Sequence, residues 1–87
     1  MLNVYSVYDS KAQTYNTPFF MKQDGQALRA FIDLANDNRT DVAKHPEDYS
    51  LFLLASFDDE DGVIDPLETP KCIAKAWELI AQNNEAK

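Results

Sequence analysis

The chain has a single cysteine and only two glycines among its 87 residues. One cysteine excludes an internal disulfide and a multi-cysteine zinc site, and it fits a reducing compartment. Two glycines are too few for a phosphate-binding glycine loop. No segment reaches the roughly 20 apolar residues of a membrane-spanning helix, and the first residues lack the basic start of a signal peptide. We therefore expect a small, soluble, single domain over residues 1–87 that needs no cofactor.

The negative charge of the chain is confined to its second half. Residues 1–44 contain equal numbers of acidic and basic residues, so residues 45–87 carry the whole net charge of −7. A protein that coats DNA usually has a net positive field, because most non-specific affinity comes from neutralising phosphates. The composition argues against a general DNA coat. It leaves room for a local site on the neutral half and for a basic protein partner on the acidic half.

The first half of the chain predicts two strands followed by a helix. Residues 2–8 are rich in β-branched and aromatic side chains, which is typical of a strand, and residues 18–21 predict a short second strand. Asp24 is placed to cap the helix that follows. The apolar residues of that helix recur at helical spacing up to Ala35, and the asparagine and aspartate residues that follow end it. A polar loop is expected over residues 39–46.

The second half predicts a strand hairpin and a final helix. Residues 49–57 are apolar on both strand faces, which indicates an interior strand. Asp61-Gly62 is a hairpin signal, and Pro66 makes the return strand 63–68 an edge strand. Thr69 and Pro70 fit the start of a helix. The predicted fold class is therefore α+β: a mostly antiparallel sheet of three to four strands, two helices packed on one face, and the order β-β-α-β-β-α.

No catalytic or metal-binding constellation is evident in the sequence. His45 is the only histidine and has no recognisable nucleophile or ligand cluster in its vicinity. The acidic turn resembles a calcium loop with Gly62 at the sixth position, but Phe57 occupies the first position, where a carboxylate is required. We expect a protein that is not an enzyme and that binds no metal.

Aromatic and basic residues occur together in the first half of the chain. Exposed aromatic side chains beside cations stack unpaired bases, so these residues form a candidate single-stranded DNA site: Tyr5, Tyr8, Lys11, Tyr15, Lys22 and Arg29. Core packing and a homodimer interface are alternative roles for the same aromatic residues.

Three segments carry a resemblance to a known family. They are Val4 to Ala12 (VYSVYDSKA), Pro18 to Phe20, and Lys44 to Asp48. Together they resemble the small non-structural protein of gokushovirus-type microviruses, which are tailless phages with single-stranded DNA. The resemblance implies a short protein of the host cell cytoplasm that acts in viral DNA replication, in the switch to single-stranded genome synthesis. It supplies no catalytic residues.

Two functions from different classes follow from these observations. One is a replication protein that binds single-stranded DNA. The alternative is a dimeric acidic adaptor without DNA affinity, which binds the viral replication initiator or a host replication protein through an acidic turn. The residues of that turn are Asp58, Asp59, Glu60 and Asp61. A scaffold-like role in capsid assembly is a third hypothesis.

Overall fold

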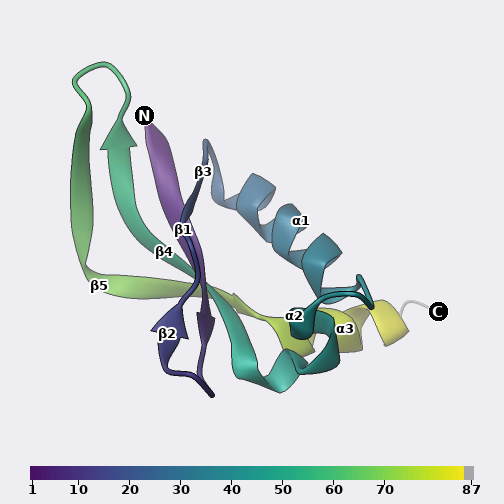
Figure 1. Cartoon of the computed structure of the whole chain (residues 1–87). Helices are drawn as coiled ribbons and strands as arrows, with labels where there is room; N and C mark the ends of the chain where they lie inside the picture. The colour runs from purple at the N-terminus through teal and green to yellow at the C-terminus, as the bar shows by residue number, and fades with distance from the viewer. Residues whose placement is uncertain (86–87) are drawn as a thin grey trace.

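The computed structural model describes residues 1–85, with side chains described as far as Ile80, and forms one antiparallel sheet with helices beside it (Figure 1). The strands are β1 (Leu2–Asp9), β2 (Thr14–Tyr15), β3 (Phe19–Met21), β4 (Tyr49–Asp58) and β5 (Val63–Lys75). The helices are α1 (Asp24–Ala35), α2 (Asp41–Lys44), the 3-10 helix η1 (Pro46–Asp48) and α3 (Ala76–Glu85). The strands run in the order β2-β1-β4-β5, and β3 also pairs with β1. The predicted α+β class is confirmed.

The two strands with the strongest sequence pattern form the centre of the sheet. β1 pairs with β4 along its whole length and with β2 and β3 on its other side. β5 pairs only with β4 and forms the edge that Pro66 predicted. A proline is tolerated there because an edge strand has one row of backbone groups outside the hydrogen-bond ladder.

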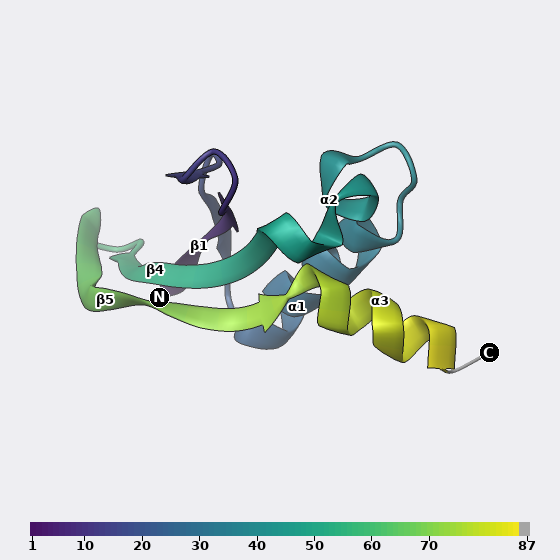
Figure 2. The same cartoon turned by 90° about the horizontal axis from the view of Figure 1, so that it is seen from below.

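The core lies between one face of the sheet and the helices α1 and α3. Tyr5, Val7 and Leu51 project from the sheet into a buried cluster that includes Phe31 of α1 and Leu79 of α3. The helices lie together at one end of the molecule, and the β4–β5 hairpin extends away from them (Figure 2). We call the end of this hairpin, residues 56–66, the arm. The opposite face of the sheet is not covered by α1 or α3.

The start of α1 differs from the prediction for Asp24. The N-cap residue is Gln23, without a side-chain capping bond, and Asp24 is the first helical residue. The carboxylate of Asp24 instead accepts a hydrogen bond from the hydroxyl of Tyr5. Asp24 therefore ties the first turn of α1 to β1, and its negative charge also suits a helix N-terminus.

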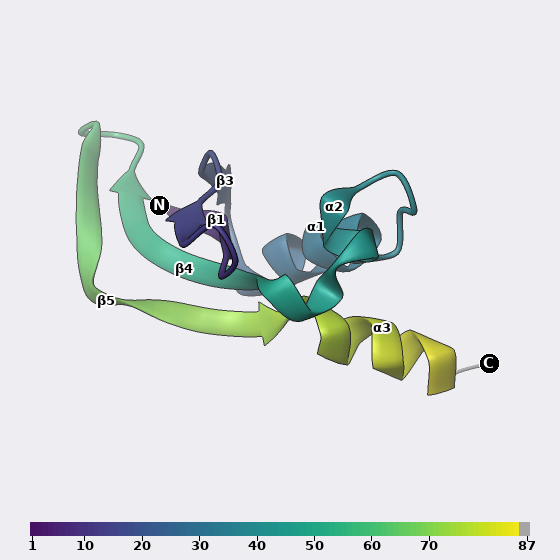
Figure 3. The ribbon, with the colours of Figure 1, turned by 60° about the horizontal axis from the view of Figure 1, so that its bottom comes forward.

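The predicted helix start at Thr69 and Pro70 is wrong, because β5 continues to Lys75 and α3 begins at Ala76. Ala55 pairs with Pro66 and Leu53 pairs with Lys71, so residues 67–70 of β5 lie opposite Leu54 alone. A bulge of this kind bends a strand and accommodates a proline. Figure 3 shows the resulting bend between the arm and the lower half of β5.

Three small elements, β2, α2 and η1, were absent from the sequence prediction. The segment expected to be only a turn after β1 contains the two-residue strand β2, and the loop expected over residues 39–46 contains α2. The hydroxyl of Thr40 accepts a hydrogen bond from the N–H of Ala43 at 3.2 Å and so caps α2. Such short elements lack the hydrophobic period from which longer ones are predicted.

Candidate nucleic-acid interface

Three aromatic rings cluster on the sheet face that the helices leave uncovered. The ring of Tyr8 lies 4.6 Å from that of Tyr15 and 5.9 Å from that of Phe52, centroid to centroid. The rings of Tyr15 and Phe52 are 5.7 Å apart and nearly perpendicular. Tyr15 is 43% exposed, so part of its side chain is accessible to a ligand. We call these three residues the aromatic cluster.

Strand alternation places the aromatic cluster opposite the core. Val7 and Tyr5 of β1 project toward the helices, so Tyr8 projects to the other face. Tyr8 pairs with Tyr15 of β2, and Ser6, on the same face as Tyr8, pairs with Phe52 of β4. Residues that pair across antiparallel strands lie on the same face. The cluster is thus built by three strands.

A tight turn joins β1 to β2 and carries Lys11. The carboxylate of Asp9 accepts hydrogen bonds from the N–H groups of Lys11 at 2.9 Å and Ala12 at 3.2 Å. Gln13 has a positive φ of 60°, a conformation that reverses the chain within a short turn. Lys11 is exposed at this turn, next to the strand ends that carry Tyr8 and Tyr15.

A second lysine, Lys75, is in register with the aromatic cluster on its far side, and it also borders a hollow beside Leu28 of α1 and Leu79 of α3. Tyr8 pairs with Ser50 of β4, and Ser50 pairs with Lys75 of β5. The row across the sheet therefore runs from Tyr15 through Tyr8 and Ser50 to Lys75. Sequence reasoning missed Lys75 because it assigned this residue to a helix. It also missed Phe52, although this residue alternates with the core residues Leu51 and Leu53.

Two of the residues predicted for the DNA site do not belong to this face. Tyr5 is fully buried, and burial together with the hydrogen bond to Asp24 raises the pKa of its hydroxyl to about 12. The ring of Tyr5 is therefore part of the core and is not available for base stacking. Arg29 is exposed on α1, which packs on the opposite face of the sheet.

Lys22 lies near a second, smaller group of aromatic side chains at the arm. The ring centroids of Phe20 in β3 and Phe57 in β4 are 5.4 Å apart. Each of these residues pairs with a residue of β1 that projects to the same face as Tyr8. The two rings therefore lie on the same face as the aromatic cluster. Hydrogen bonding to the N-terminal amine lowers the pKa of Asp59, and Lys22 contributes in the same direction. Lys22 therefore lies close enough to Asp59 for its charge to act on that carboxylate.

The acidic turn forms the tip of the arm. The carboxylate of Asp58 accepts hydrogen bonds from the N–H groups of Glu60 and Asp61 and thus holds the turn. Asp59 pairs with the N-terminal amine at 3.2 Å. The carboxylates of Asp58 and Asp61 also border a hollow of about 330 Å³. Its complete lining is Met1, Ser56, Asp58, Asp61, Val63 and Asp65.

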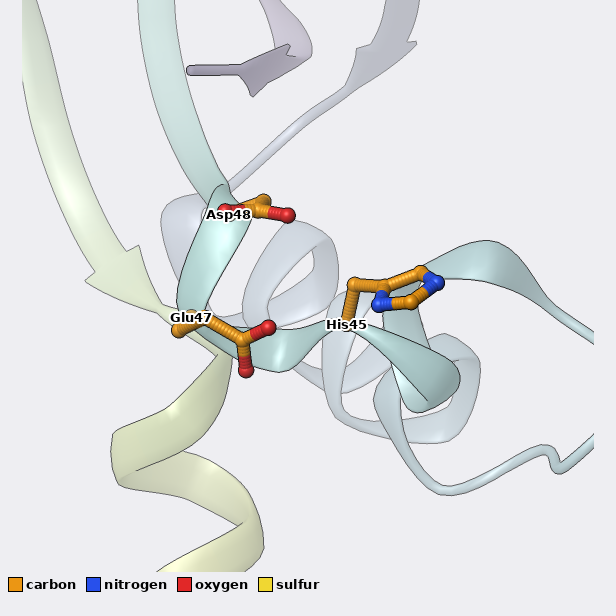
Figure 4. A group of neighbouring side chains, drawn as sticks. All are labelled: His45, Glu47 and Asp48. Atoms are coloured by element: carbon orange, nitrogen blue, oxygen red, sulfur yellow. The ribbon is translucent and has the colours of Figure 1, made fainter. Parts of the chain in front are cut away.

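One group of side chains in the described residues has the spacing of metal ligands, namely His45, Glu47 and Asp48 (Figure 4). This grouping of two carboxylates with His45 was not anticipated from the sequence. η1 turns Glu47 and Asp48 back toward the histidine that precedes it. Nothing in the sequence besides the closeness of the three residues indicated this arrangement.

A model of the Phage ORF5 protein family matches residues 2–79. The chain belongs to the Phage ORF5 protein family. The resemblance to a phage family is thus confirmed at the level of a bacteriophage protein. No match was found among curated proteins or among solved structures. Within the described residues, no helix combines the length and apolar character needed to cross a membrane.

Proposed function

We propose that this phage protein binds single-stranded DNA through the aromatic cluster and acts, without enzymatic activity, in viral genome replication. The observation that carries the proposal is the group formed by the exposed Tyr15 and the half-buried Tyr8 and Phe52, with Lys11 and Lys75 on its two sides. The resemblance to gokushovirus-type microviruses adds the setting: the host cell cytoplasm and the switch from duplex replication to single-stranded genomes.

The chemistry of the face favours unpaired bases over duplex DNA. An unpaired base can stack on an aromatic ring, which is worth about 1–3 kcal/mol per base, whereas duplex bases are already stacked on one another. Lys11 and Lys75 supply positive charge on the two sides of the cluster. The acidic arm repels phosphates, so affinity depends on stacking more than on charge. The protein is therefore expected to bind single-stranded DNA selectively but weakly.

Replacement of Tyr15 by alanine is expected to weaken binding of a labelled oligothymidine by about 5- to 150-fold, the equivalent of 1–3 kcal/mol. Fluorescence anisotropy of the labelled strand measures this affinity. Trp77→Ala is the matched control, because Trp77 is 52% exposed on α3 and lies away from the cluster. An equal loss of affinity in both variants, or no binding by the natural protein at low salt, would exclude the proposed interface.

The salt dependence gives a second readout in the same assay. Two neutralised phosphates predict a slope of about −1.4 for the logarithm of affinity against the logarithm of salt concentration. Lys11→Ala should reduce the size of the slope by about 0.7. Arg29→Ala should leave it unchanged, because Arg29 lies on α1 at the other side of the sheet.

The arm supports a second candidate function, a dimeric adaptor that binds a basic protein. The hollow bordered by Asp58, Asp61 and Asp65 has room for a lysine or arginine side chain. These three carboxylates are not spaced as ligands of one metal ion, which favours an extended organic cation. Val63 and Ile64 are more than half exposed beside them and offer apolar contact to a partner or to a second copy of the chain.

For the adaptor, the double variant Asp61→Asn with Asp65→Asn should weaken binding of a labelled arginine-rich peptide about 10-fold or more, since it removes two carboxylates from the hollow. Asp58 is left intact because it holds the turn. Asp33→Asn with Glu78→Gln removes the same charge from exposed helical positions and is the matched control. If both variants lose the same affinity, binding reflects net charge and the hollow is not the site.

A further inference from the structure

His45, Glu47 and Asp48 bring one imidazole nitrogen and two carboxylate oxygens together on a short segment. The three potential ligand atoms all lie within 4.8 Å of one another. Figure 4 shows the three side chains projecting from the turn between α2 and β4, around η1. His45 and Glu47 are exposed and Asp48 is half-buried. A small rotation of the exposed side chains is enough to close the remaining distance, since ligands of a tetrahedral zinc ion lie about 3.3 Å apart.

The backbone that carries these ligands is held from both sides. The N–H of His45 donates to the carbonyl of Asp41 at 2.9 Å, which ends α2, and the N–H of Asp48 donates to the carbonyl of His45 at 3.0 Å. The carbonyl of Asp48 accepts from both the N–H and the hydroxyl of Ser10, at 2.9 and 3.1 Å. The backbone of the three residues is therefore fixed before any ion binds, which lowers the entropic cost of forming a site.

The side chains of His45, Glu47 and Asp48 are available to bind an ion. Neither of the two ion pairs found in the described part of the chain involves His45, Glu47 or Asp48. A hollow of about 190 Å³ adjoins His45 and Asp48, and its other lining residues are Asp9, Lys11 and Tyr49. It provides space for water molecules in the coordination positions that the protein leaves open. The ammonium group of Lys11 opposes a cation in this hollow, and the carboxylate of Asp9 offsets it.

We propose that His45, Glu47 and Asp48 bind one divalent transition-metal ion, of which Zn²⁺ fits best. Three protein ligands with nitrogen and carboxylate donors, and a fourth position left to water, are a common arrangement for zinc. The imidazole selects zinc over magnesium and calcium, which prefer oxygen ligands throughout. The site requires neither the aromatic cluster nor a nucleic acid, and it shares only Lys11, which borders its hollow, with the proposed DNA interface.

The test uses the untagged full-length protein, because a histidine tag would bind the same ions. His45 is the only histidine of the chain, so one imidazole gives rise to all the histidine ring signals in a ¹H–¹⁵N spectrum. Addition of Zn²⁺ should shift these signals and saturate at one ion per chain. Isothermal titration calorimetry measures the affinity, and millimolar Mg²⁺ should not compete.

Three variants separate the site from general attraction of cations to an acidic protein. His45→Ala and Glu47→Gln should each weaken Zn²⁺ binding about 10-fold or more, since even outer-shell partners of metal sites are worth that much. Glu60→Gln removes the same charge from the arm and should change the affinity less than twofold. His45→Asn, judged by circular dichroism, guards against a folding defect. Unshifted imidazole signals at 1 mM Zn²⁺, or equal losses in Glu47→Gln and Glu60→Gln, would overturn the proposal.

Discussion

Replacement of Phe31 by alanine is expected to lower the free energy of unfolding by about 3–5 kcal/mol. Phe31 is 2% exposed and is the large side chain by which α1 enters the buried cluster. An 87-residue domain has a total stability of only about 4–13 kcal/mol. The cluster has one sheet face and residues of α1, α2 and α3 around it, so no second core compensates for the cavity. This single truncation should therefore remove much of the stability of the fold.

Urea denaturation followed by circular dichroism measures the effect. Phe31→Leu keeps most of the volume and should cost about 1–1.5 kcal/mol, which gives a measurable value even if the alanine variant is largely unfolded. Phe20→Ala is the matched control, because Phe20 is 44% exposed on the other face of the sheet. If truncation of Phe20 and truncation of Phe31 cost the same, α1 does not pack on the sheet as described.

Elements with a strong local pattern could be predicted from the sequence, and elements determined by distant pairing could not. Residues 49–57 are apolar on both strand faces, and apolar residues recur at helical spacing after Asp24. Each pattern predicts its element without reference to the rest of the chain. Thr69-Pro70 is a valid local signal for a helix start, but the pairing of Lys71 to Lys75 with β4 overrides it. Thr69 and Pro70 instead lie in the bulge at residues 67–70.

The residues of the candidate interface likewise divide into those that local sequence could predict and those that depend on distant pairing. Tyr8 and Tyr15 flank a polar turn, so their proximity could be predicted from the order of the residues. The sequence could not show which face of β1 the helices cover, because both faces carry apolar residues. Tyr5 was for that reason assigned to the DNA site, whereas its hydroxyl is bonded to the helix that covers it. Lys75 became a neighbour of the cluster only through the register of β5.

The buried hydroxyl of Tyr5 predicts a loss of stability at alkaline pH. Burial is the main cause that raises its pKa from 10 to about 12, and the hydrogen bond to Asp24 acts in the same direction. A proton held more tightly in the folded state stabilises that state, fully below the unfolded pKa near 10. The stabilisation is lost as pH rises through 12. Two pKa units correspond to about 2.7 kcal/mol.

Tyr5→Phe should abolish this dependence while it keeps the ring in the core. At pH 8 the variant should be less stable by about 1.5–3 kcal/mol, because it loses a hydrogen bond to a charged carboxylate. That difference should shrink between pH 10 and 12, measured by urea denaturation of both proteins at each pH. Comparison of the two proteins cancels the titration of lysines and of Tyr49, whose pKa is also raised by burial and by nearby carboxylates.

Absorbance of the phenolate near 295 nm provides an independent test of the same group. The natural protein has four tyrosines, and the one that ionises near pH 12 should be missing from the titration of Tyr5→Phe. If the two stability curves run parallel up to pH 12, the hydroxyl of Tyr5 is solvated. In that case the bond between β1 and the first turn of α1 does not contribute to stability, and Tyr5 is again a candidate for the exposed face.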